Sequence, residues 1–152
     1  MPRTVSLGLM LRKPLFKEMF GVLVLIAFLH ITGMNYFWYW KFFWFDILTH
    51  FLGGLWVGLA VLWLGNYLLE DWKLNKRQTM FFVLCAVVFI GISWEVFEYV
   101  NGITVANKKG YWSDTYLDII MDLIGGVLAG LYGWRMLKKT EVVLTDNTIK
   151  YE

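Results

Sequence analysis

Six carboxylates and one histidine stand in apolar stretches of this chain at spacings suited to chemistry. They form three groups: Asp46 with His50, Glu95 with Glu98, and Asp114 with Asp118 and Asp122. Spacings of three and four residues place side chains on one face of a helix. A charge deep in hydrocarbon costs at least about 2.5 kcal/mol on insertion scales, so these acids need partners, water or a metal. The pattern therefore indicates a functional site.

The combination of carboxylates with imidazole suits a divalent metal ion. Oxygen ligands favour Mg²⁺, Ca²⁺ or Mn²⁺, and an imidazole ligand adds Zn²⁺ to the candidates. Such an ion is the cofactor that we expect, and its predicted ligands are His50, Glu95, Asp118 and Asp122. Because six carboxylates exceed the needs of one ion, we expect Glu98 or Asp46 to act as a catalytic base or to orient His50.

The same residues also allow interpretations without a metal. Asp46 and Asp114 are placed where they can act as N-caps that complement a helix dipole. The deeper acids lie too far inside for capping, but they can be carboxylates hydrogen-bonded to Trp, Tyr or Lys neighbours. His50 by itself is typical of a satisfied polar residue, and His30 has no acid nearby on its own helix. The sequence leaves open whether His30 and Asp114 belong to the site.

Membrane-spanning helices must position these residues, because the composition is far too apolar for a soluble domain. Of the 152 residues, 59% are hydrophobic, against roughly 45 to 50% in soluble domains. Segments 18–40, 43–69, 79–100 and 115–137 each approach the roughly twenty residues that cross a bilayer. The sequence predicts an all-α, polytopic fold: one domain over 1–139 with four transmembrane helices and a short interfacial segment near its N-terminus, at 5–16.

The last segment, 140–152, is predicted to be a cytoplasmic tail, and its alternating pattern suggests a small hairpin. Eleven of the fourteen Lys and Arg residues fall at the two ends of the chain and in the second connection. The positive-inside rule then places both termini of this multi-pass protein in the cytoplasm. With this orientation the acids gather in the outer half of the membrane and form a pocket that opens to the outer face.

Several other function classes are disfavoured. The net charge of +2, without a basic block interleaved with aromatics, argues against nucleic acid as a partner. The first apolar run ends in bulky aromatics instead of a small-residue cleavage site, which favours a retained span over a signal peptide.

Trp38, Tyr39, Trp40 and Trp44 are typical of an interfacial aromatic belt. Cys85, the only cysteine, can form no internal disulfide and is expected to pack in the core.

Small residues continue the polar faces of the last three helices. Gly54 and Gly58 follow His50, Gly126 and Gly130 follow Asp122, and Gly91 precedes Glu95 by one turn. Small residues at such spacing let helix backbones approach closely in lipid. We therefore expect these helices to pack tightly in the inner half and to splay around the polar cluster in the outer half.

Three segments also carry a family resemblance: DILTHFLGG at 46–54, WEVFEY at 94–99 and DIIMDLIGG at 118–126. With these segments the chain resembles the YjdF-like family of small bacterial inner-membrane proteins, and their order is similar to the wider VanZ-like pattern. The resemblance implies a membrane fold of four to six helices and a shared polar constellation, but no reaction, because the activity of the family is unassigned. It supports Asp46, His50, Glu95, Glu98, Asp118 and Asp122 as the site. The family's first acid on the last helix lies nearer Thr115, so the resemblance does not extend to Asp114.

These observations favour an integral-membrane, metal-dependent hydrolase or transferase that acts on a lipid or lipid-linked substrate at the outer face. The chain has no glycine-rich phosphate loop, no serine nucleophile elbow and no intramembrane arginine, so no single reaction is indicated. The alternative is a protein that binds or transports protons or divalent ions through the same carboxylates. A structural accessory subunit, in which the acids pair across helices, is a third possibility. The oligomeric state stays open.

Overall fold

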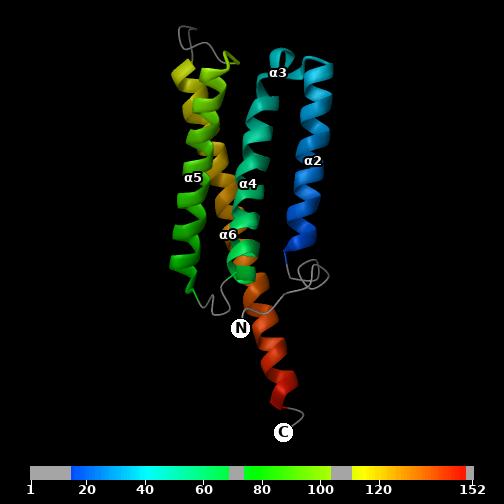
Figure 1. Cartoon of the computed structure of the whole chain (residues 1–152), viewed down its shortest axis with the longest axis vertical. Helices are drawn as coiled ribbons and strands as arrows, with labels where there is room; N and C mark the ends of the chain where they lie inside the picture. Colours follow the sequence, from blue (N-terminus) through cyan, green and yellow to red (C-terminus); the bar gives the residue numbers. More distant parts are fainter. Residues whose placement is uncertain (1–14, 69–73, 104–110, 150–152) are drawn as a thin grey trace.

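The computed structural model describes residues 15–68, 74–103 and 111–149, and helices make up nearly all of this part of the chain (Figure 1). Its elements are α2 (Phe16–Asn35), α3 (Trp38–Lys41), α4 (Phe43–Leu68), α5 (Lys76–Val100) and α6 (Tyr111–Ile149). The all-α prediction is confirmed. The predicted interfacial segment at 5–16 lies almost wholly outside the described residues.

Four of these helices are long and apolar enough to cross a membrane. The candidate spans are Phe16–Asn35, Phe43–Asn66, Lys76–Val100 and Trp112–Lys138, which confirms the predicted number. The first span is shorter than expected, because Phe37 has a φ of 60°, in the left-handed region that ends a right-handed helix. The aromatic residues that follow form the short helix α3 instead of continuing α2.

Helix α4 lies at the centre of the bundle. It packs against α2, α5 and α6, and α5 also packs against α6. Figure 1 shows α3 at one end of the bundle, between the end of α2 and the start of α4. Because α5 ends and α6 begins at this same end, the acids near those helix ends are brought to one level beside the first turns of α4.

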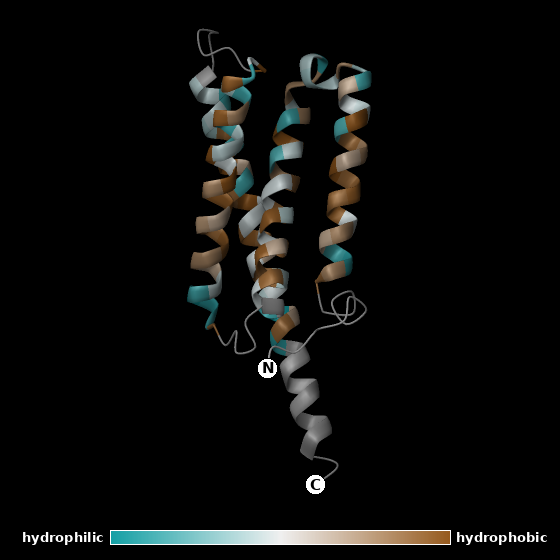
Figure 2. Ribbon diagram, viewed as in Figure 1, coloured by the Kyte–Doolittle hydropathy of each residue, from teal (hydrophilic) through white to brown (hydrophobic). Residues whose placement is uncertain are grey.

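The other half of the bundle holds the hydrophobic core. Leu62, Val83, Val87 and Ala129 are almost completely buried, and they come from α4, α5 and α6. Outward surfaces are hydrophobic as well, as Figure 2 shows for much of α2 and α5. Large exposed apolar side chains, such as Phe89 at 70% exposure, are what a lipid-facing surface requires.

Glycines bring α4 and α6 into backbone contact. A Cβ atom added at Gly54 would collide with the backbone of Asp122, and one added at Gly125 would collide with the backbone of Phe51. One turn further on, a Cβ atom at Gly58 would lie 2.5 Å from that of Ala129. The predicted close approach through small residues is thus confirmed, and it places the Asp122 turn of α6 directly against α4.

Two smaller predictions are wrong. The hairpin expected over 141–152 does not form, since α6 continues as a helix through Ile149. An isolated two-stranded hairpin is marginal at best, whereas the helix only has to propagate. Cys85 is exposed on α5 instead of packing in the core, so the middle of that apolar helix presents it outward.

Candidate functional site

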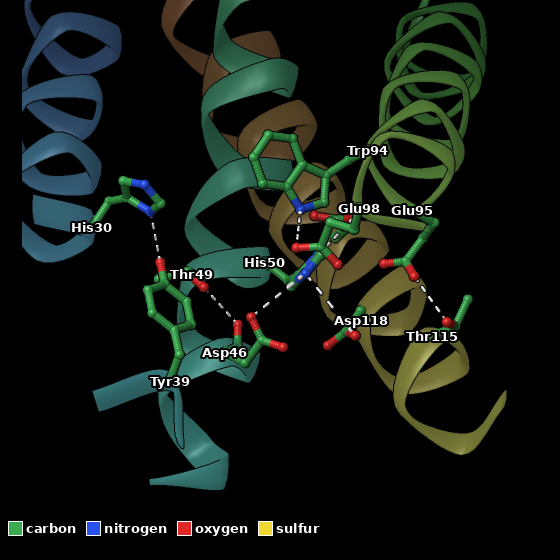
Figure 3. Close-up of polar contacts among 11 residues, drawn as sticks. His30, Tyr39, Asp46, Thr49, His50, Trp94, Glu95, Glu98, Thr115 and Asp118 are labelled. Carbon is green, nitrogen blue, oxygen red and sulfur yellow. Dashed lines mark hydrogen bonds and ion pairs between the residues drawn. The ribbon is translucent and has the colours of Figure 1, made fainter. Parts of the chain in front are cut away.

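His50 is the centre of the polar cluster at the α3 end of the bundle (Figure 3). The residue is only 7% exposed, and each of its two ring nitrogens faces carboxylates. Nδ1 lies 3.4 Å from Oδ2 of Asp122, while Nε2 lies 3.8 Å from Oδ1 of Asp46 and 4.0 Å from Oδ2 of Asp118. With its proton on Nδ1, the ring donates to Asp122 and presents the Nε2 lone pair to the other two acids.

The geometry around Nε2 fits a metal ion. Nε2 and one oxygen each from Asp46 and Asp118 all lie within 4.8 Å of one another. Two ligands bound about 2.0 to 2.6 Å from one ion lie at most about 4 to 5 Å apart, so the three atoms can share an ion after small movements. One imidazole with two carboxylates suits Zn²⁺ and Mn²⁺, and the spare positions suit water or substrate.

Charge balance at the cluster also favours a bound cation. Asp118 is 4% exposed and Asp122 is 7% exposed, so both carboxylates are largely removed from water. Within the described part of the chain, the ion pairs all involve His50, and no lysine or arginine pairs with these acids. One imidazolium can balance a single negative charge. When Asp46, Asp118 and Asp122 are all ionised, at least two of these carboxylates therefore have no counter-charge. A divalent ion would supply the missing positive charge.

Glu95 and Glu98 lie beside this cluster on α5. Among the described residues, the carboxylates within ion-pair distance of His50 are those of Asp46, Asp118 and Asp122 instead. Oε2 of Glu95 accepts a hydrogen bond of 2.8 Å from the Thr115 hydroxyl, and the side chain is 7% exposed. Its second oxygen, Oε1, is buried and has no hydrogen-bond partner in the described structure. Glu98 accepts a 3.0 Å hydrogen bond from the indole of Trp94. Both carboxylates point toward the cluster in Figure 3.

His30 lies apart from this group, whereas Asp114 lies at its edge, close enough to Asp46 and Asp118 for its charge to act on both carboxylates. His30 is exposed on α2, where its Nδ1 lies 3.0 Å from the hydroxyl of Tyr39, and burial raises the pKa of that tyrosine. Asp114 is exposed in the first turn of α6, where a negative charge complements the helix dipole. The structure therefore brings Asp46, His50, Asp118 and Asp122 together, with Glu95 and Glu98 beside them.

The sequence does not predict the roles of two residues that shape the site, Thr115 and Gly91. Thr115 holds Glu95, and its only sequence signal was its position three residues before Asp118 on the same helical face. Gly91 is needed for space, because a Cβ atom there would lie 2.7 Å from Oδ2 of Asp122. The spacing of small residues predicts a helix-packing role for Gly91, whereas the structure gives it a role in accommodating the Asp122 carboxylate.

Comparison with known protein families finds a match over most of the chain. Residues 5–139 match the model of a family described as "Predicted membrane protein (DUF2238)". No curated protein and no solved structure matches the chain. The matched range contains all four candidate spans and every acid of the cluster.

Proposed function

Since the chain belongs to this family of membrane proteins, the YjdF-like family, we propose that it is a divalent-metal-dependent enzyme of the membrane. The proposed activity is hydrolysis or group transfer on a lipid or lipid-linked substrate. The cluster lies inside segments of spanning length, so a substrate reaches it most directly from the lipid phase or from the membrane surface. The positive-inside pattern of the sequence supports the outer face as the membrane surface from which the substrate enters.

The arrangement of His50 carries the proposal. A metal-binding histidine commonly donates its second ring N–H to a carboxylate, which fixes the tautomer and aims the other nitrogen at the ion. His50 has this arrangement, with Nδ1 on Asp122 and Nε2 toward Asp46 and Asp118. The ligands would then be His50, Asp46 and Asp118, and Asp122 would position the imidazole. This proposal changes three assignments predicted from the sequence. Asp122 and Glu95 are predicted there as ligands, and Asp46 as a catalytic base or a residue that orients His50.

Three protein ligands leave coordination positions for water and substrate, as in catalytic metal sites. A bound divalent ion would make that water acidic and stabilise negative charge on the substrate's reacting oxygens. Glu98 is the candidate proton acceptor, because it faces the cluster while Trp94 holds one of its oxygens. An acceptor close to the site is what general base catalysis needs.

The same geometry also suits the second function, binding of a proton or ion without catalysis. His50 lies within ion-pair distance of three carboxylates, so an imidazolium ion would be stabilised there without a metal. Transport is less well supported. Beyond the cluster, the described core is closed by Leu62, Val83 and Val87, each at most 1% exposed, and these offer no ligand for an ion that moves onward.

Metal analysis of the purified protein tests the proposal. We expect about one divalent ion per chain by elemental analysis after dialysis, and loss of the ion in His50→Ala and Asp118→Asn. His30→Ala is the matched control, because it removes an exposed histidine outside the cluster and should keep the ion. Wild-type protein that stays free of metal after supplementation with Mg²⁺, Mn²⁺, Zn²⁺ and Ca²⁺ would refute the metal site and favour the proton-binding alternative.

A further inference from the structure

A groove between α5 and α6 borders the cluster on the side of Glu95. It has a volume of about 400 Å³, and its walls are mainly apolar, with Ile92, Val96 and Ile119 among them. Glu95 and Thr115 also line this groove. Along the same pair of helices, a second groove of about 400 Å³ is lined only by apolar residues, among them Leu84 and Leu123. Both grooves therefore have apolar walls, and the first also contains one acidic residue, Glu95.

Glu95 lines the groove and is close enough to Asp118 of the candidate metal site for the two charges to interact. Its partner Thr115 stands three residues before Asp118 on α6, a spacing that places side chains about 5 to 6 Å apart at Cβ. Ile119, in the groove wall, directly follows Asp118 in the chain. A molecule lying in the groove therefore has its polar end within one helical turn of the cluster.

The carboxylate of Glu95 determines which kind of ligand the groove favours. Oε1 of Glu95 is buried without a hydrogen-bond partner, although the residue is only 7% exposed. A buried carboxylate oxygen in this state needs both a hydrogen-bond donor and a positive charge. Neither lysine nor arginine occurs among the described residues that line the groove. A primary ammonium group meets both needs, whereas a quaternary ammonium cannot donate and an anionic head would be repelled.

We propose that the groove binds a phospholipid whose headgroup carries a primary amine. Its acyl chain lies against the apolar walls of the groove, its ammonium group engages Glu95, and its phosphate faces the candidate metal ion. The phosphate contact rests on the proposed function, but the groove and Glu95 do not. Because Oε1 is shielded from water, the ammonium reaches it through rotation of the Glu95 side chain toward the groove.

Native mass spectrometry of the full chain tests this proposal with three probes of equal acyl length: phosphatidylethanolamine, phosphatidylcholine and phosphatidylglycerol. Wild-type protein should retain phosphatidylethanolamine about tenfold more tightly than either other lipid, a difference of the size that one charge-assisted contact provides. Glu95→Gln should abolish most of this preference while keeping the side-chain shape. Ile119→Trp should fill the groove and weaken retention of all three lipids. Phe89→Trp, on the lipid-facing side of α5 outside the groove, is the control and should match wild type.

Equal retention of the three lipids by wild-type protein would overturn the proposal, and so would a preference that Glu95→Gln leaves unchanged. If Glu95→Gln does not fold, loss of retention in Ile119→Trp but not in Phe89→Trp decides whether this groove is the site. Repeating the measurement after chelation separates the two proposals. Amine selectivity in a chain that never retains metal would overturn the metal centre alone, whereas metal retention without lipid selectivity would overturn the groove alone.

Discussion

Nδ1 of His50 lies 3.4 Å from Oδ2 of Asp122, across the interface between α4 and α6. The two residues are 72 positions apart in the chain, and both are 7% exposed. This contact determines which ring nitrogen is available to an ion, because a proton held on Nδ1 leaves the lone pair on Nε2. The contact also gives different roles to Asp118 and Asp122, which look equivalent in the sequence.

Asp122→Asn should weaken metal binding without abolishing it. Loss of a carboxylate that orients a histidine ligand typically costs about 10 to 100-fold in metal affinity. Asp118→Asn removes a proposed ligand and should cost more. Competition with a chelator of known affinity, at fixed pH, measures both. An Asp122→Asn protein that binds metal less tightly than Asp118→Asn would reverse these two assignments.

Gly91→Ala should impair the site more than the fold. The added methyl group would lie 2.7 Å from Oδ2 of Asp122, so the carboxylate must move away from His50. We expect metal affinity to fall by about tenfold, as for loss of the Asp122 contact itself. Gly21→Ala is the control, since a Cβ atom there has no neighbour within 4 Å and should leave metal binding unchanged. Unaltered metal affinity in Gly91→Ala would show that Asp122 is free to move.

Gly54→Ala should separate α4 from α6. Its Cβ atom would collide with the Asp122 backbone, which cannot rotate away as a side chain can. Overpacking of this kind costs about 1 to 3 kcal/mol in the free energy of unfolding. Gly53→Ala, the neighbouring position, meets only Oδ1 of Asp122 at 3.6 Å and is the matched control. Reversible unfolding in mixed micelles measures both variants, and equal stability would contradict the backbone contact.

Thr115→Val should destabilise the protein by leaving both oxygens of the Glu95 carboxylate without a donor. An unpaired buried polar group costs about 1 to 3 kcal/mol, and more when it is charged. Thr32→Val, whose hydroxyl bonds to the backbone of its own helix at Phe28, should change stability by no more than about 0.5 kcal/mol. The double variant Thr115→Val with Glu95→Gln should be less destabilised than the sum of the single changes. Additive effects would show that the hydrogen bond contributes little.

Cysteine labelling tests the orientation in the membrane. Lys108→Cys should react with an impermeant thiol reagent from outside the cell, because the positive-inside rule places the connection between α5 and α6 there. Cys85 is exposed on α5, so Cys85→Ser is introduced first to remove background labelling. Reaction only after permeabilisation would show that the bundle has the opposite orientation, with the cluster in the cytoplasmic half of the membrane.

The sequence by itself determined the helices and the composition of the site. Hydrophobic length specifies the four spans, and the period of the helix specifies that Asp46 shares a face with His50, and Asp118 with Asp122. These are local properties of single segments. They also predicted that the acids near the helix ends would meet at one level, because consecutive spans reverse direction.

The tertiary structure decided which side chains meet across helices. The offset and rotation between α4 and α6 depend on the close contact of Gly54 and Gly125 with the opposing backbones, and no period within one helix encodes that contact. It places His50 with Nδ1 on Asp122 and Nε2 toward Asp118, and it turns Asp46 from a capping candidate into a possible ligand. The offset between α5 and α6 likewise joins Thr115 to Glu95. Packing between helices therefore gave each acid its role, since side-chain partners follow from how backbones fit together.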